Sequence, residues 1–152
     1  MNNLYKTISQ TRYLKLFKEI IDRAQMIEEF KTGGPFTVFA PHNNAFHLYT
    51  SYDPDDEAHE YLQAPLETIL SSPEIAKQTL RHLLVPHKFK LKDLNNLTSI
   101  TALDGNSIPI ETTDDTIIVG NSSIMNFDID CTNGIIHVTE ELLQPTLIYQ
   151  TT

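Results

Sequence analysis

Cysteine, tryptophan and long hydrophobic runs are scarce or absent in this sequence. Its 152 residues include one cysteine, Cys131, and no tryptophan. A single cysteine excludes an intramolecular disulfide, and Cys131 has no Lys or Arg beside it in the sequence to favour a reactive thiolate. No stretch approaches the roughly 20 apolar residues that span a bilayer, and the first residues lack the apolar core of a secretory signal. We therefore expect either a cytoplasmic protein or one whose leader has been removed.

Positive charge is also scarce. The 20 Asp and Glu residues outnumber the 11 Lys and Arg residues, which gives a formal net charge of −9. That sign repels phosphate groups, so nucleic acids and anionic membranes are poor partners, whereas a basic or cation-bridged partner suits it. The length fits one compact domain, which we place at residues 1–152.

Glycine is too rare for the common catalytic and nucleotide-binding loops. The five glycines do not have the spacing of a phosphate-binding loop or of a Gly-x-Ser-x-Gly nucleophile turn. The pair His59-Glu60 opens like a zinc-protease motif, but Gln63 stands where the second histidine is required. We therefore expect neither an enzyme nor a resident cofactor or metal.

An acidic segment at residues 53–60 leaves one alternative function open. Its Asp53, Asp55 and Asp56 offer carboxylates to a cation, although the Gly and Glu that an EF-hand needs are replaced by Ala58 and Ala64. Three histidines lie nearby in the sequence: His42, His47 and His59. The alternative function is thus a small-ligand or metal-ion-binding protein, and otherwise this segment is a solvated loop.

The first part of the chain has helical periodicity. Apolar residues from Leu14 to Ala24 recur at spacings of three and four, after a possible N-cap at Thr11. Ser72-Pro73-Glu74 is a strong helix start, and the helix that follows has an apolar face from Ile75 to Leu84.

The last third has strand periodicity. Met125, Phe127 and Ile129 alternate with polar residues, which predicts a half-buried strand. Asp104-Gly105 is a hairpin signal. The other predicted strands are 36–40, 97–103, 107–111, 116–119, 135–138 and 146–150. Helices first and strands afterwards indicate an α+β domain.

Two short segments carry a resemblance to a known family. The first is Thr37-Val-Phe-Ala-Pro-His-Asn-Asn-Ala-Phe46, and the second is Asn133-Gly-Ile-Ile-His-Val-Thr-Glu-Glu-Leu-Leu-Gln-Pro145. They resemble the two signature stretches of the fasciclin domain. The matching positions are Thr37, Val38, Phe39, Ala40, Pro41, Asn43, Ala45, Phe46, Asn133, Gly134, Ile136, His137, Val138, Leu143 and Pro145. Because both segments read as buried strands, we expect them to determine the fold, and we expect His137 to be partly buried and hydrogen-bonded across the sheet.

A third segment departs from the family pattern. The family has Tyr-His and then Val-Pro-Gly, whereas this chain has Arg81-His82 and later Val85-Pro86-His87. In the family the Tyr-His segment is linked with integrin-type binding. The candidate partner-binding residues are therefore Arg81, His82 and His87, together with Asp53, Asp55 and Asp56 of the acidic segment, although His82 also fits a packing or hydrogen-bonding role in its helix.

The resemblance covers essentially the whole chain and implies a fold and a function. It implies an α+β β-sandwich or wedge of mainly antiparallel strands, with N-terminal and central helices packed around it. It also implies a non-enzymatic adhesion or interaction module, secreted, periplasmic or attached to a cell surface. The implied partner is a protein or glycan at a cell surface or in a matrix, or a second copy of the chain.

Overall fold

The computed structural model describes residues 1–50, 65–114 and 116–143. Its helices are α1 (Leu4–Gln10), the 3-10 turn η1 (Arg12–Leu14), α2 (Lys15–Ala24), α3 (Ile27–Thr32), α4 (Asn43–Thr50), α5 (Pro65–Leu70), α6 (Pro73–Leu83) and α7 (Leu91–Leu94). Its strands are β1 (Phe36–Pro41), β2 (Leu84–Pro86), β3 (Ser99–Thr101), β4 (Ser107–Thr112), β5 (Ile117–Val119), β6 (Ser122–Cys131) and β7 (Gly134–Thr139). The predicted α+β class is confirmed, while the predicted strand 146–150 lies outside the described residues.

The strands join in one seven-stranded order, β2-β1-β7-β6-β5-β4-β3. Strand β1 is parallel to β7, and the other neighbouring pairs are antiparallel. Leu103, which follows β3, donates its N–H to the Leu84 carbonyl of β2 at 2.9 Å. This bond joins the two ends of the order, so the sheet curls almost closed. Of the sandwich or wedge that the resemblance implied, this arrangement is the wedge.

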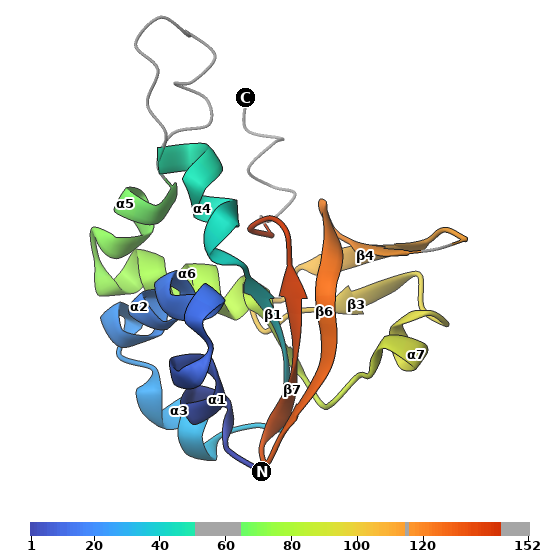
Figure 1. Ribbon diagram of the computed structural model, residues 1–152, viewed down its shortest axis with the longest axis horizontal. Coiled ribbons are helices and arrows are strands. Elements are labelled where there is room, and N and C mark those ends of the chain that lie inside the picture. Colours follow the sequence, from blue (N-terminus) through green and yellow to red (C-terminus); the bar gives the residue numbers. More distant parts are fainter. Residues whose placement is uncertain (51–64, 115, 144–152) are drawn as a thin grey trace, which may run out of the picture.

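Most of the helices gather on one side of this sheet. In Figure 1, α1, α2, α3, α5 and α6 lie beside β1 and β7, whereas β3, β4 and α7 lie on the far side of β6. The apolar face predicted for α2 is fully buried, including Phe17, Ile20 and Ile21. No helix in the described ranges is both long enough and apolar enough to cross a membrane.

The helices differ in part from the sequence prediction. An additional helix, α1, precedes the helix predicted after Thr11, and the side chain of Asn3 caps it by accepting the N–H of Lys6. The predicted helix begins after Thr11 as the 3-10 turn η1 and continues as α2. Thr11 itself makes no side-chain cap. The cap predicted for α6 is confirmed, since Ser72 Oγ accepts the N–H of Ile75 at 3.2 Å. Leu84, predicted as the last apolar residue of that helix, instead begins β2.

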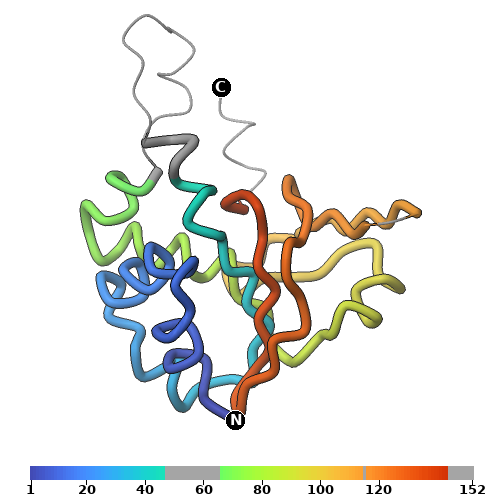
Figure 2. Tube along the Cα trace, viewed as in Figure 1, coloured from blue at the N-terminus to red at the C-terminus, as the bar shows by residue number. Residues whose placement is uncertain are grey.

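The N-terminus is fastened to the turn between β6 and β7. Figure 2 shows the blue start of the chain beside the lower end of the red β7. Thr132 donates its N–H to the Asn2 carbonyl at 2.9 Å, and Leu4 donates its N–H to Asn133 Oδ1 at 2.8 Å. Residues at opposite ends of the sequence therefore complete the same corner of the core.

Candidate interaction surface

The first signature segment lies inside the core. Thr37, Phe39 and Ala40 are fully buried in β1, and the core also contains Val38, Pro41, Ala45 and Phe46. The Thr37 hydroxyl donates to the His87 carbonyl at 2.6 Å and accepts the N–H of Phe89 at 2.8 Å. The signature therefore fixes the loop that follows β2 as well as β1 itself.

Asn43 of this segment joins two helix starts. Its Oδ1 accepts the N–H of Leu16 at 3.0 Å, and its Nδ2 donates to the Arg12 carbonyl at 3.2 Å. His42, which replaces the family's Thr, caps α4 because its Nδ1 accepts the N–H of Asn44 at 3.0 Å. These contacts are structural, and that the signature determines the fold stays a prediction.

In the second signature segment, the Asn and the Gly each have a structural role. Asn133 Nδ2 donates to the carbonyls of Phe30 and Gly33, both at 3.0 Å, while its Oδ1 holds Leu4. A Cβ at Gly134 would lie 2.4 Å from the Phe36 carbonyl oxygen, so no larger residue fits there. Ile136, Val138 and Leu143 are buried, and Pro145 lies outside the described residues.

His137 is fully buried and links two surface segments. Its Nε2 donates to the Phe89 carbonyl at 2.7 Å, and its Nδ1 accepts the N–H of Asp128 at 3.2 Å. Burial lowers the pKa of His137, against the opposing effects of the Phe89 carbonyl and the Asp128 charge. The neutral imidazole therefore holds both segments, as the predicted hydrogen bond across the sheet requires.

The partner-binding residues predicted around α6 differ from one another in exposure. Arg81 and His87 are exposed, and His87 has φ 77°, so it keeps the left-handed backbone for which the family uses glycine. His82 is only 3% exposed, and its Nδ1 lies 2.8 Å from Asp104 Oδ2. The proposed partner contact through His82 is therefore corrected: the helix turns this ring inward, against the β3–β4 turn.

Asp104 anchors that turn in its charged form. Burial acts to raise its pKa, but hydrogen bonds from the Asn106 backbone and side chain and the neighbouring His82 together lower it. The remaining predicted site residues, Asp53, Asp55, Asp56 and His59, lie outside the described residues. So do the contacts of the His47 side chain, which leaves the alternative site in this segment a prediction.

Strand β6 departs most from its predicted burial. The alternation predicted Met125 and Phe127 on the buried face, but they are 43% and 53% exposed. The pairing of β6 with β7 shifts register between Ile124 and Asn126 and again before Ile129, and Asp128 has φ 56°. These irregularities make residues 125–128 a bulge, here called the β6 bulge, which turns both apolar side chains outward.

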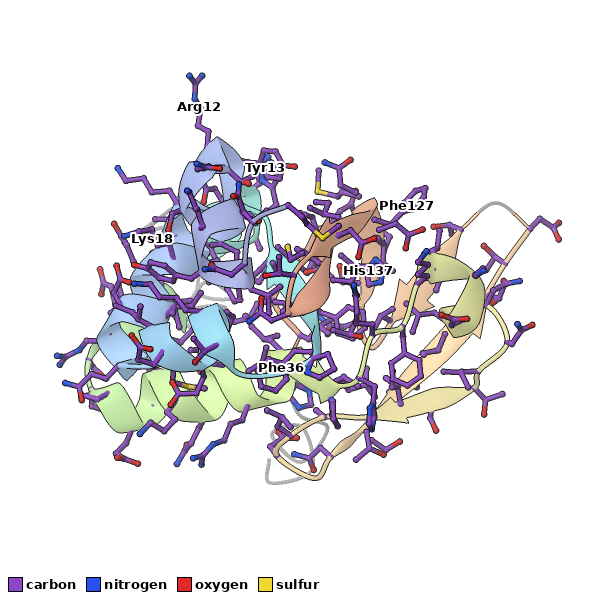
Figure 3. All side chains as sticks on the ribbon, turned by 90° about the horizontal axis from the view of Figure 1, so that it is seen from below. Arg12, Tyr13, Lys18, Phe36, Phe127 and His137 are labelled. Carbon is purple, nitrogen blue, oxygen red and sulfur yellow. The ribbon has the colours of Figure 1, made fainter. Side chains whose placement is uncertain are left out.

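Three side-chain hydrogen bonds fix the β6 bulge. Asn126 Nδ2 donates to the Tyr13 hydroxyl at 2.9 Å, and the Asp128 N–H bonds to His137. Asp128 Oδ1 accepts the N–H of Leu91 at 2.9 Å. In Figure 3, Phe127 projects from β6 while His137 lies beneath it, and Tyr13 and Arg12 lie toward the same side of the molecule.

A groove of about 470 Å³ adjoins the β6 bulge. Leu91 of α7 lies along one wall, the segment between β4 and β5 with Thr112 and Asp114 along another, and Phe127 and Asp128 at the bulge. Sequence reasoning missed both features. The available signal was Asp128, because Asp and Asn are enriched at left-handed backbone positions.

The described residues offer little for catalysis. Across the three described ranges, no group of three or more His, Cys, Asp and Glu residues could hold a metal ion. Cys131 is buried, and burial raises the pKa of its thiol, against the smaller lowering effect of the Thr7 hydroxyl. Cys131 is thus a poor nucleophile.

The chain is similar in sequence to a known domain family and to several known proteins. The family model for the Fasciclin domain matches residues 12–145. Rat stabilin-2 is 32% identical over 121 residues, covering 78% of this chain but only 7% of stabilin-2. The chain likewise spans 4% of mouse stabilin-2, at 30% identity. The Synechocystis protein sll1735 is 28% identical, over 90% of this chain and 92% of its own length.

A solved structure shares the fold. It is described as a FAS1 domain pair from the insect cell adhesion molecule Fasciclin I, and it superposes with a TM-score of 0.70 at 17% identity. The match covers 94% of this chain and 51% of that chain. With the family model matching most of its length, the chain belongs to the fasciclin domain family.

Proposed function

We propose that this domain is a non-enzymatic interaction module that binds a protein partner at a cell surface or in a matrix through the β6 bulge. The observation that carries the proposal is the exposure of Met125 and Phe127 on a segment fixed by three side-chain hydrogen bonds. Two large apolar side chains exposed on one short segment form the kind of apolar patch that marks interaction sites.

The chemistry of the bulge favours a protein partner. Aromatic residues, Met and Arg are enriched at protein interfaces, and a few such anchors supply most of the binding energy. Tyr13 lies beside the bulge, because its hydroxyl accepts the hydrogen bond from Asn126, and its ring stacks on His42 with centroids 5.1 Å apart. Because the segment is already held in place, little conformational entropy is lost when a partner binds.

Family membership supports the same class of function and an extracellular place of action. The structural neighbour comes from a protein described as a cell adhesion molecule. We propose a secreted, periplasmic or cell-surface location on that ground. Self-association is the less favoured form of adhesion, because two copies each carrying a net charge of −9 repel one another.

A paired substitution tests the proposal. The fluorescently labelled domain is titrated against an array of purified extracellular matrix proteins, with Phe127→Ala as the test and Leu103→Ala as the control. Leu103 is also an exposed large apolar residue, at 40%, but it lies after β3. We expect Phe127→Ala to weaken binding at least about tenfold, as anchor residues do, and Leu103→Ala to weaken it less than about twofold.

Two outcomes would contradict the proposal. One is equal loss in both variants, which indicates non-specific hydrophobic contact. The other is binding that Phe127→Ala leaves unchanged, which places the contact surface elsewhere. Urea unfolding of both variants separates a lost contact from a lost fold.

A further inference from the structure

The groove beside the β6 bulge is open and bordered by two projecting elements. Helix α7 and the end of the β4–β5 hairpin lie on the same side of β6, away from the helical layer (Figure 1). The groove between them has a volume of about 470 Å³, within the range of about 300–1,000 Å³ typical of ligand sites. Because residues of two projecting elements border it, an extended segment can enter the groove where a flat partner surface cannot.

The apolar part of the groove is continuous with the proposed anchor. Leu91, Ile117 and Ile124 line it, and Phe127 belongs both to its wall and to the exposed bulge. Ile117 is 8% exposed and Phe127 is 53% exposed, so the apolar surface runs from the interior out to the rim. A bound segment therefore meets apolar side chains along one of its sides.

The charge of the groove and of its surroundings is negative. Two carboxylates line the groove, those of Asp114 and Asp128, and one ammonium, that of Lys92. Asp128 uses Oδ1 to hold Leu91, and its Oδ2 has no hydrogen-bond partner among the described residues. Residues 82–143 contain nine Asp and Glu against three Lys and no Arg. Such a potential favours a cationic ligand and disfavours an anionic one.

We infer that the groove binds an extended segment of the protein partner in which a basic side chain lies between apolar ones. The basic side chain pairs with Asp114 and Asp128, and its apolar neighbours pack on Ile117 and Phe127. This inference rests on the proposed function and adds the chemical character of the partner's contact segment. It also predicts that acidic glycans do not bind in the groove, because the negative potential repels them.

Short peptides test the inference directly. The probe is the pentapeptide acetyl-Ser-Leu-Arg-Leu-Ser-amide, titrated into the full chain while amide chemical shifts are recorded. We expect shifts at Thr113, Asp114, Thr116 and Phe127, which line or adjoin the groove. The same peptide with Glu in place of Arg is expected to produce none of them. Raising the ionic strength is expected to weaken the arginine peptide, because exposed charges are screened.

Matched charge variants locate the contact. The double variant Asp114→Asn, Asp128→Asn is expected to weaken binding of the arginine peptide about three- to tenfold, as the loss of two exposed ion pairs would. Asparagine at 128 retains the Oδ1 acceptor for Leu91, so the bulge is expected to stay folded. Glu140→Gln is the control, since Glu140 is exposed and belongs to the same acidic region but does not line the groove. It is expected to change the affinity by less than about twofold.

Several results would overturn the inference. These are the absence of groove shifts, equal binding of the Glu peptide, and equal weakening by Glu140→Gln. Shifts at the groove caused by methyl β-glucopyranoside but not by the peptide would assign it to a neutral glycan instead. If the peptide binds at the groove and Phe127→Ala leaves matrix-protein binding intact, the anchor fails but the groove assignment stands. If Phe127→Ala abolishes that binding and the peptide does not bind, the anchor stands and the groove assignment fails.

Discussion

Phe39 and Phe127 belong to strands of one sheet, separated only by β7, yet the protein uses them in opposite ways. Phe39 is fully buried and packs against His137, with ring centroids 5.9 Å apart. Phe127 is 53% exposed on a bulge that the same histidine holds from beneath. The family signature thus lies almost wholly in the β1–β7 core, and the candidate contact surface lies one strand away from it.

This difference separates two kinds of sequence information. Residues of the β1–β7 core close the fold, so a match there shows membership of the family and says little about a partner. Met125 and Phe127 of the β6 bulge are instead exposed, at 43% and 53%, so their side chains contribute little to the core.

The largest expected contrast comes from one substitution made in both regions. Phe39→Ala should lower the free energy of unfolding by about 3–5 kcal/mol, because it removes a fully buried ring and leaves a cavity. Phe127→Ala should lower it by less than about 1 kcal/mol, because that ring is half exposed. Urea unfolding measures both. Similar losses for the two variants would mean that the bulge belongs to the core.

A second pair compares asparagines. Asn133→Ala should cost about 2–4 kcal/mol, because it removes hydrogen bonds to Leu4, Phe30 and Gly33 at once. Asn126→Ala removes only the bond to the Tyr13 hydroxyl and should cost about 0.5–1 kcal/mol. Thermal and urea unfolding test this order. A smaller cost at Asn133 would show that water replaces its contacts, against our account of this signature position.

The pH dependence of stability tests the link between the regions. Burial lowers the pKa of folded His137 below its ordinary value of 6.5, so the unfolded chain takes up this proton first as the pH falls. The contribution of His137 is therefore fully present above about pH 6.5 and decreases below it. His137→Gln should abolish that part of the pH profile, as measured by unfolding between pH 5 and 8. An unchanged profile in the variant would assign the effect to another group.

The smallest expected effect is a gain. His87 has φ 77°, a backbone region that costs a non-glycine residue about 1–2 kcal/mol, while glycine adds about 0.5–1 kcal/mol of unfolded-state entropy. His87→Gly should therefore raise the free energy of unfolding by up to about 1 kcal/mol. His87→Ala keeps the Cβ and should give no gain. An equal gain with alanine would trace the strain to the imidazole rather than to the backbone.

Local signals predicted the elements that depend on neighbouring residues. Ser72 and Pro73 start α6 as expected, and the apolar period from Leu14 to Ala24 lies on the buried side of α2. The two signature strands were also predicted, because β-branched apolar runs bounded by turn residues form buried strands in most settings.

Tertiary contacts decided the elements that sequence reasoning missed. The alternation in β6 predicts a regular strand, but the bulge requires Asp128 in a left-handed conformation and His137 beneath it. Leu84 fits the helical face of α6, yet it pairs with Val38 across the sheet and so begins β2. Pairing across the sheet overrides local preference at both places.

The parallel pairing of β1 with β7 has a consequence for the order of folding. Phe36 lies opposite Gly134, so this ladder joins residues that are far apart in the sequence. Contacts of such long sequence separation slow folding, because a large loop must close before they can form. On the ribosome, β1 is made early and waits for its neighbour until residues 134–139 have left the exit tunnel. Until then the edge of β1 that will pair with β7 has no partner, and unpaired strand edges favour aggregation.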